Sequence, residues 1–250
     1  MRLDKYLSQR TEFSRSRIKD LIAEKKVMVN DIAAVKANMN VSEADNITIA
    51  GNAVRQEKFI TLIMNKPAGY ISATEDRSEK IVIDLLPPEY SGQKLSPVGR
   101  LDKDTTGMLL LTNDGELLHK LTSPKKHVMK YYIAHLSREF TSEAARLLEN
   151  GIALKDGSIC KPSKAAALDE KRQTILIAIS EGKYHQVKRM LAAAGNHVEK
   201  LHRTAIGGLV IPEDLLPGES RVLSDKDLCK VLKTNDIFSL LINMLRKNSS

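Results

Sequence analysis

A short polar stretch between two glycines holds the side chains best suited to chemistry. It reads Gly99, Arg100, Leu101, Asp102, Lys103, Asp104, Thr105, Thr106 and Gly107. An apolar run at 108–111 follows directly and predicts a buried strand. Loops held by a rigid strand are common places for catalytic side chains, and an aspartate with an ordinary pKa of about 3.9 is ionised at neutral pH. The stretch therefore offers a carboxylate as nucleophile or base. The plain alternative is that Asp102 or Asp104 caps a turn while Arg100 forms a surface ion pair.

A second group of charged residues lies between residues 181 and 203. Its five basic members outnumber its two acidic ones: Lys183, Lys188, Arg189, Lys200 and Arg203 stand against Glu181 and Glu199. Within it, residues 184–194 have apolar side chains at helical spacing and predict a helix. Its basic residues either face solvent or meet a polyanion such as nucleic acid.

The common signatures of cofactor and metal enzymes are absent from the sequence. It contains no G-x-G-x-x-G, G-x-x-x-x-G-K-[ST], H-E-x-x-H, C-x-x-C or G-x-S-x-G pattern. The six histidines are never paired at helical ligand spacing, and Cys160 and Cys229 have no spacing typical of a metal site. We therefore expect neither a cofactor nor a metal ion.

Composition favours a soluble protein with a polyanionic partner. The chain has 250 residues, 42% of them hydrophobic and 28% charged, with a net charge of +8. Its apolar runs are all shorter than the roughly 18 residues that a spanning helix needs, and its first residues lack the apolar stretch of a signal peptide. These features predict a cytoplasmic protein with no membrane partner.

The pattern of elements predicts an α+β protein in two parts. Residues 1–57 predict two short helices and a small sheet. Residues 58–230 predict a mixed, mainly antiparallel sheet with flanking helices, and residues 231–250 a helical extension. The elements expected in the larger part are strands at 59–64, 108–111, 131–136 and 174–180, helices at 82–86, 114–121, 141–150 and 184–194, and a hairpin turn at 155–158.

The N-terminal segment resembles the S4 RNA-binding module. The resemblance is carried by Arg2-Leu3-Asp4-Lys5, Ser14-Arg15, Leu21-Ile22 and Val27-x-Val29-Asn30. Two positions depart from it, because Lys25 and Asp31 stand where the module commonly has glycine. The resemblance implies a helix pair that docks on folded RNA, with its basic side chains meeting phosphates: Arg2, Lys5, Arg15, Arg17 and Lys19.

The rest of the chain, to about residue 230, resembles the RsuA/RluB-type pseudouridine synthases. Five motifs occur in the family order. They are Asn65-Lys66-Pro67-x-Gly69-Tyr70, Gly99-Arg100-Leu101-Asp102-x-x-Thr105-Thr106-Gly107 with Thr112-Asn113-Asp114-Gly115, Lys130-x-Tyr132, Glu181-Gly182-x-Tyr184-His185-Gln186-Val187-Lys188-Arg189-Met190 and Leu201-His202-Arg203. The stretch from residue 180 to residue 198 is most similar to the RsuA branch, which modifies 16S rRNA.

This resemblance implies a reaction and a site. Uridine would become pseudouridine by cleavage of the N1–C1′ bond and re-attachment through C5, without a cofactor. Asp102 is implied as the catalytic carboxylate, Lys188 as its basic partner, and Tyr132 as the ring that stacks on the base and helps remove the C5 proton. Because a paired uridine must leave the helix to react, Arg100 is implied to fill the vacated stack. His185, Gln186 and Arg189 are expected to contact RNA as well.

Several alternatives stay open from the sequence. The substrate is expected to be ribosomal RNA or the assembling small subunit, bound by a monomer. The same chemistry on 23S rRNA, as in the RluB, RluE and RluF relatives, is one alternative. A non-catalytic RNA-binding or ribosome-assembly protein built on the S4 module is the other. Asp102 acts either by forming a covalent adduct or by removing a proton from the sugar.

Overall fold

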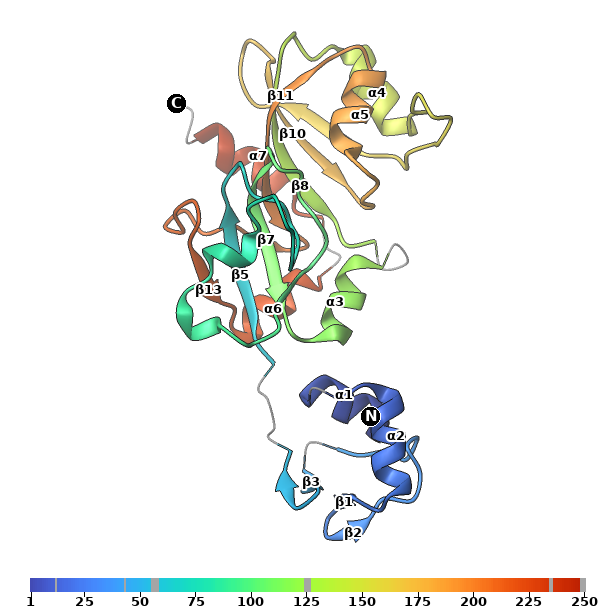
Figure 1. The fold of residues 1–250 in the computed structure, drawn as a ribbon. Helices are drawn as coiled ribbons and strands as arrows, with labels where there is room; N and C mark the ends of the chain where they lie inside the picture. Colours follow the sequence, from blue (N-terminus) through green and yellow to red (C-terminus); the bar gives the residue numbers. More distant parts are fainter. Residues whose placement is uncertain (12, 43, 55–58, 124–126, 234–235, 248–250) are drawn as a thin grey trace. The chain divides into compact units, whose positions relative to one another are not determined.

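The computed structural model describes residues 1–11, 13–42, 44–54, 59–123, 127–233 and 236–247. Contacts divide the chain into two compact units, Met1–Phe59 and Ile60–Ser250 (Figure 1). The boundary predicted between residues 57 and 58 lies outside the described residues. Each unit has its own core.

The smaller unit pairs two helices with a four-stranded antiparallel sheet. The helices are α1 (Leu3–Arg10) and α2 (Arg15–Ala23), and the strands are β1 (Val27–Val29), β2 (Ile32–Ala33), β3 (Ile47–Ile49) and β4 (Asn52–Ala53), in the order β2-β1-β3-β4. The side chain of Ser14 accepts a hydrogen bond from the backbone N–H of Arg17 and caps α2. The apolar stripes of both helices are buried against the sheet, as their helical spacing predicts.

Two tight turns of this unit are left-handed without glycine. Lys25, between α2 and β1, has φ of 55°, and Asp31, between β1 and β2, has φ of 65°. A left-handed conformation costs an ordinary residue about 1–2 kcal/mol. The two positions where the S4 module commonly has glycine are therefore left-handed here without glycine, at a cost to stability.

The larger unit is built on one mixed sheet. Within the described chain the sheet has nine strands, with the path β13-β5-β7-β11-β8-β10-β9, while β6 pairs with β7 and β12 with β11. Every pairing is antiparallel except that of β7 with β11. The strands are β5 (Thr61–Lys66), β6 (Ser96–Pro97), β7 (Thr106–Thr112), β8 (Lys130–Leu136), β9 (Lys164–Ala167), β10 (Thr174–Ile179), β11 (Val198–Ile206), β12 (Leu209–Val210) and β13 (Ser220–Val222). The predicted α+β class with a mainly antiparallel sheet is confirmed.

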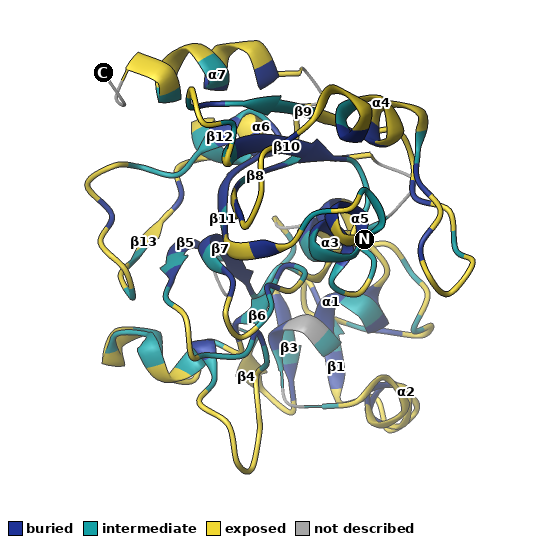
Figure 2. Cartoon of the chain, turned by 90° about the horizontal axis from the view of Figure 1, so that it is seen from above, coloured by how far each residue is buried: buried dark blue, intermediate teal, exposed yellow. Residues whose placement is uncertain are grey.

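Helices cover both faces of this sheet. They are η1 (Val82–Leu85), η2 (Pro88–Tyr90), α3 (Gly115–Thr122), α4 (Ser142–Asn150), α5 (Gln186–Ala193), α6 (Asp225–Val231) and α7 (Phe238–Lys247). Neighbouring strand residues point to opposite faces: Tyr132 joins the core beneath α4 and α5, while Tyr131 joins the core beneath α7. Figure 2 shows β7, β8 and β10 of the large sheet as largely buried, with α7 and α5 on opposite sides of β8 and β10.

Three expected elements differ in detail. The first strand of the larger unit is Thr61–Lys66 rather than 59–64, because β7 pairs with it as far as Lys66. The helix expected at 184–194 begins at Gln186, since His185 before it is left-handed. The turn at 155–158 is closed by backbone hydrogen bonds between Leu154 and both Gly157 and Ser158, but it joins an isolated bridge between Ala153 and Ile159 rather than two strands.

The C-terminal segment packs against the body of the larger unit. Residues at its expected helical spacing, among them Phe238 and Leu241, are buried against β8 and β10. Across the part of the chain that the structure describes, no helix is long and apolar enough to cross a membrane.

Candidate active site

Asp102 lies in a turn between β6 and β7 that is fixed by its backbone. The turn is closed by a hydrogen bond from the N–H of Thr105 to the carbonyl of Asp102, 3.1 Å long. On the other side, the buried hydroxyl of Ser72 donates to the carbonyl of Leu101 and accepts from its N–H, both at 3.0 Å. The backbone on either side of Asp102 is therefore held without using its carboxylate.

A buried lysine ties this turn to the end of β5. Lys66 is fully buried, and its ammonium donates to the carbonyls of Pro67, Asp102, Lys103 and Thr105 at 3.0, 3.1, 3.3 and 2.8 Å. Buried charges persist only when polar groups compensate them. Lys66 thus joins the turn to a rigid strand of the sheet.

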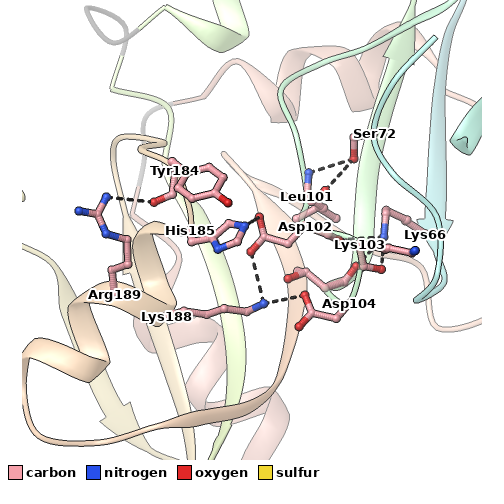
Figure 3. Close-up of polar contacts among 11 residues, drawn as sticks. Lys66, Ser72, Leu101, Asp102, Lys103, Asp104, Tyr184, His185, Lys188 and Arg189 are labelled. Atoms are coloured by element: carbon pink, nitrogen blue, oxygen red, sulfur yellow. Dashed lines mark hydrogen bonds and ion pairs between the residues drawn. The ribbon is translucent and has the colours of Figure 1, made fainter. Parts of the chain in front are cut away.

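Two cationic or ionisable groups from the start of α5 face Asp102. Lys188 Nζ is 3.4 Å from one carboxylate oxygen of Asp102, and His185 Nε2 is 3.3 Å from the other. Figure 3 shows Lys188 reaching between Asp102 and Asp104. Since α5 packs on the sheet through Val187, Met190 and Leu191, its polar residues are held rigidly over the turn.

Lys188 is shared between two carboxylates and lies nearer to the more exposed one. Its ammonium is 2.6 Å from Asp104, whose side chain is 72% exposed, whereas the side chain of Asp102 is 24% exposed. The hydrogen bond from Lys188 lowers the pKa of Asp104 below its usual range. Asp104 thereby holds Lys188 close to Asp102 while leaving the Asp102 oxygens more loosely engaged.

A cavity of about 480 Å³ opens at this point. Its lining consists of Ala68, Gly69, Asp102, Lys103, Asp104, His185 and Lys188. The volume falls in the range of small-ligand pockets, roughly 300–1,000 Å³. The arrangement therefore presents a carboxylate, flanked by an ammonium and an imidazole, to a group of that size.

Tyr132 lies deeper, in the sheet. Its side chain is buried on β8, and its hydroxyl is 3.5 Å from Nη1 of Arg203, the residue opposite it on β11. The Nε–H of Arg203 donates to the carbonyl of Met108 at 2.7 Å. Tyr132 is not among the residues that line the cavity, but it belongs to the same core as Leu101, next to Asp102.

Gln186, expected to contact RNA, is buried instead. Its amide nitrogen donates to Glu181 at 2.7 Å, and its amide oxygen accepts from the N–H of Lys183 at 2.8 Å. Both polar atoms of the side chain therefore serve the turn that leads into α5. The motif signals a turn here rather than an RNA contact.

The other expected RNA contacts lie at the surface in both units. Arg100 is exposed, and Arg189 is partly exposed and paired with Asp156 at 2.6 Å. In the smaller unit, the basic residues lie on α1 and α2 or directly before α1; they are Arg2, Lys5, Arg15, Arg17 and Lys19. Lys5 is half-buried and the other four are exposed.

Within the described ranges, no group of three histidine, cysteine, aspartate or glutamate side chains is arranged to hold a metal ion. Four further residues support the site, although the sequence did not assign them to it: Ser72, Lys66, Asp104 and Arg203. Three of them stand in or beside the quoted motifs, which was their only signal in the sequence.

Lys66 is expected to titrate far below the exposed lysines. Burial lowers its pKa to about 8 from an ordinary value of 10.5. Between these two values the unfolded chain binds more protons than the folded one, so the contribution of Lys66 to stability rises with pH across the window. In NMR spectra with ¹³C-labelled lysine, the Cε resonance of Lys66 should titrate near pH 8, while exposed lysines titrate near pH 10.4.

The resonance of Lys66 must be distinguished from that of a second lysine, Lys130. Burial also lowers the pKa of Lys130 to about 8, so two resonances should move together. The Lys130→Met variant should remove one of them and leave the other. A Lys66 resonance that titrates near 10.5 would show that its ammonium is solvated in the folded protein.

Comparisons with known proteins consistently match pseudouridine synthases. The family model described as RNA pseudouridylate synthase matches residues 60–193, and the S4 domain model matches residues 1–47. The chain is 43% identical over 231 residues to an uncharacterized RNA pseudouridine synthase of Bacillus subtilis, and the alignment covers 91% of this chain and 97% of the relative. It is 36% identical over 234 residues to the ribosomal small subunit pseudouridine synthase A of Escherichia coli, covering 93% and 100%. A crystal structure of a pseudouridylate synthase matches with a TM-score of 0.67 at 34% identity, covering 92% of this chain and 99% of that one.

Proposed function

The chain belongs to the RNA pseudouridylate synthase family, and from this premise we propose that it converts one specific uridine of 16S rRNA to pseudouridine. The observation that carries the proposal is the carboxylate of Asp102, which lines the cavity together with Lys188 and His185. A protein that only binds RNA has no need of such a carboxylate in the lining of a cavity. This argues against the non-catalytic alternative.

The reaction is an isomerisation and balances without a co-reactant. The N1–C1′ bond breaks, the uracil turns, a C5–C1′ bond forms, and the proton on C5 is exchanged for one on N1. In the proposed mechanism the carboxylate of Asp102 either adds to the nucleotide or removes a proton from its sugar. Lys188, with its ammonium 3.4 Å from the carboxylate of Asp102, is proposed to hold that carboxylate in position during this step.

Tyr132 is proposed to take part in the transfer of the C5 proton. Its hydroxyl lies 3.5 Å from Nη1 of Arg203, which is proposed to hold the hydroxyl in position for this transfer. Because the ring is buried and does not line the cavity, this role requires the site to open further when the uracil binds. It also requires a uridine that has left its helix.

The basic side chains are proposed to position the RNA. Contacts to phosphates set the register of a nucleic acid without reading its sequence. Arg100 is exposed beside Asp102 and is suited to fill the space that the uridine leaves in its stack. The smaller unit adds basic residues on two helices. We propose that the partner is ribosomal RNA, free or in the assembling small subunit, and that the protein acts as a monomer in the cytoplasm.

The small subunit is preferred over the 23S alternative because of the relatives. Those named ribosomal small subunit pseudouridine synthase A from Escherichia coli and Yersinia pestis are both 36% identical to this chain along almost their whole length. Similarity that covers both units includes the surfaces expected to select the RNA, not only the reaction centre.

The test maps pseudouridine in both ribosomal RNAs. In a strain that lacks the gene, carbodiimide labelling and primer extension should show the loss of one pseudouridine in 16S rRNA. A plasmid with the wild-type gene should restore it, and the purified protein should form it in a 16S transcript without any cofactor. Loss of a 23S site instead would establish the alternative substrate. An unchanged set of modified sites, with no activity in vitro, would refute the enzyme proposal.

A further inference from the structure

An exposed aromatic side chain stands beside the cavity without a structural task. Tyr184, just before α5, is 75% exposed, although it is a large side chain in a unit whose other tyrosines are buried or half-buried. Its ring is stacked on the ring of His185, with the centroids 3.8 Å apart and the planes 17° apart. Tyr184 therefore does not occupy this position in order to fill the hydrophobic core.

The stack is continuous with the reaction centre. His185 lines the cavity, and its Nε2 is 3.3 Å from Asp102. Figure 3 shows the two rings parallel, with the imidazole on the side of Asp102 and the tyrosine ring beyond it. A flat aromatic surface is thus presented one ring away from the catalytic carboxylate.

The backbone that presents these rings is strained and held in place. His185 is left-handed, with φ of 46°, and such a residue persists only where its surroundings impose the conformation, often at functional sites. Here the carbonyl of Tyr184 accepts a hydrogen bond from Arg189 at 3.3 Å. The buried amide of Gln186 fixes the next residue through Glu181.

Three basic residues flank Tyr184 in the sequence, and two of them are paired with carboxylates: Lys188 with Asp104 and Arg189 with Asp156. Lys188 and Arg189 follow Tyr184 on the first turn of α5, and Lys183 precedes it and donates to the carbonyl of Ile159. A stacking ring among cations is the combination by which proteins bind unpaired nucleotides, with bases on aromatic rings and phosphates at basic groups.

We propose that Tyr184 is a stacking platform for an unpaired base of the substrate RNA, the base that neighbours the target uridine in the strand. The inference rests on the proposed function, because it takes the uridine itself to occupy the cavity at Asp102. The platform holds the strand open next to the extruded uridine and prevents the neighbour from stacking back. It also favours targets whose neighbouring base is unpaired.

Three substitutions at Tyr184 test the platform in the full chain. Tyr184→Ala should weaken binding of a 16S rRNA fragment by about 5- to 150-fold, the range to which loss of one base–aromatic stack corresponds. Tyr184→Leu, apolar but not aromatic, should behave like Tyr184→Ala, whereas Tyr184→Phe should bind like the wild type. Leu240→Ala is the matched control, since Leu240 is 56% exposed on α7, across the sheet from α5.

The RNA itself supplies the second half of the experiment. Fragments with an abasic site directly 5′ or directly 3′ of the target uridine should bind the wild type more weakly at one of the two positions. Tyr184→Ala should bind this abasic fragment as tightly as it binds the intact fragment. A 2-aminopurine at that position should lose fluorescence on binding to the wild type and to Tyr184→Phe, but not on binding to Tyr184→Ala.

The outcomes separate this inference from the proposed function. Binding and fluorescence do not depend on turnover, so they report on Tyr184 even if no uridine is converted. Wild-type affinity and quenching in Tyr184→Ala would overturn the platform and leave the synthase proposal intact. Equal losses in Tyr184→Ala and Tyr184→Phe would overturn it too, because they would assign the effect to the hydroxyl rather than to the ring.

Discussion

Asp102→Asn should abolish pseudouridine formation and leave RNA binding intact. Asparagine keeps the shape of the side chain but removes the charge that the reaction needs. Loss of a nucleophile or base of this kind lowers turnover by about 10⁴-fold or more. In a single-turnover assay on a 16S rRNA transcript, the variant should show no product above background.

Binding should survive because the turn does not depend on the carboxylate. Ser72 and Lys66 hold the backbone around Asp102 through its own and neighbouring backbone groups. Removal of the carboxylate also leaves Lys188 and His185 facing the cavity with one negative charge fewer. The affinity for a polyanion should therefore stay the same or rise slightly.

Asp104→Asn is the matched control for this variant. It makes the same chemical change two residues away, in the same turn, and also removes a carboxylate that contacts Lys188. Because Asp104 positions Lys188 and does not itself react in the proposed mechanism, turnover should fall by no more than about 100-fold, the loss that a misplaced group causes. Turnover retained in Asp102→Asn would refute the role of Asp102, and equal losses in both variants would assign the effect to Lys188.

Local patterns explain why much of the fold is predictable from the sequence. The apolar run 108–111 is β7, and Asp114 caps α3 by accepting from the N–H groups of Glu116 and Leu117. The apolar stripe of α1 is buried as its spacing requires. Each of these features depends on residues within one or two turns of the chain, which periodicity and capping rules describe directly.

The residues that support the site, by contrast, are not predictable from local patterns. Lysine and arginine are seldom fully buried, so the residue types of Lys66 and Arg203 do not predict a buried position. Their partners lie far along the chain: Lys66 bonds to carbonyls 36 to 39 residues away, and Arg203 to one 95 residues away. Such contacts depend on the sheet order β5-β7-β11, which no local pattern determines.

Gly107→Ala should prevent stable folding of the larger unit. Gly107 has φ of 99°, and a Cβ there would lie 2.4 Å from the carbonyl oxygen and 2.8 Å from the nitrogen of Arg203. Both atoms belong to the backbone of β11, at the parallel pairing with β7. Since neither strand can move without breaking its other pairings, the loss of stability should exceed about 4 kcal/mol, a size that only such clashes or comparable defects produce.

Gly157→Ala separates this clash from the cost of the backbone conformation alone. Gly157 has a similar φ of 81°, but a Cβ there would meet nothing within 4 Å. Its substitution should cost only about 1–2 kcal/mol, the usual cost of a left-handed alanine. Urea unfolding followed by circular dichroism measures both values, and similar losses in the two variants would show that β7 and β11 separate easily at Gly107.

The clash at Gly107 also connects stability to the reaction. Arg203 bonds to the carbonyl of Met108 and approaches the hydroxyl of Tyr132, while the turn that carries Asp102 leads directly into β7, where Gly107 lies. A side chain at Gly107 would push β11 away from β7 and move Tyr132 relative to Asp102. Any Gly107→Ala protein that folds at low temperature should therefore bind RNA but turn over more slowly than wild type, because proton transfer requires its partners within hydrogen-bond reach.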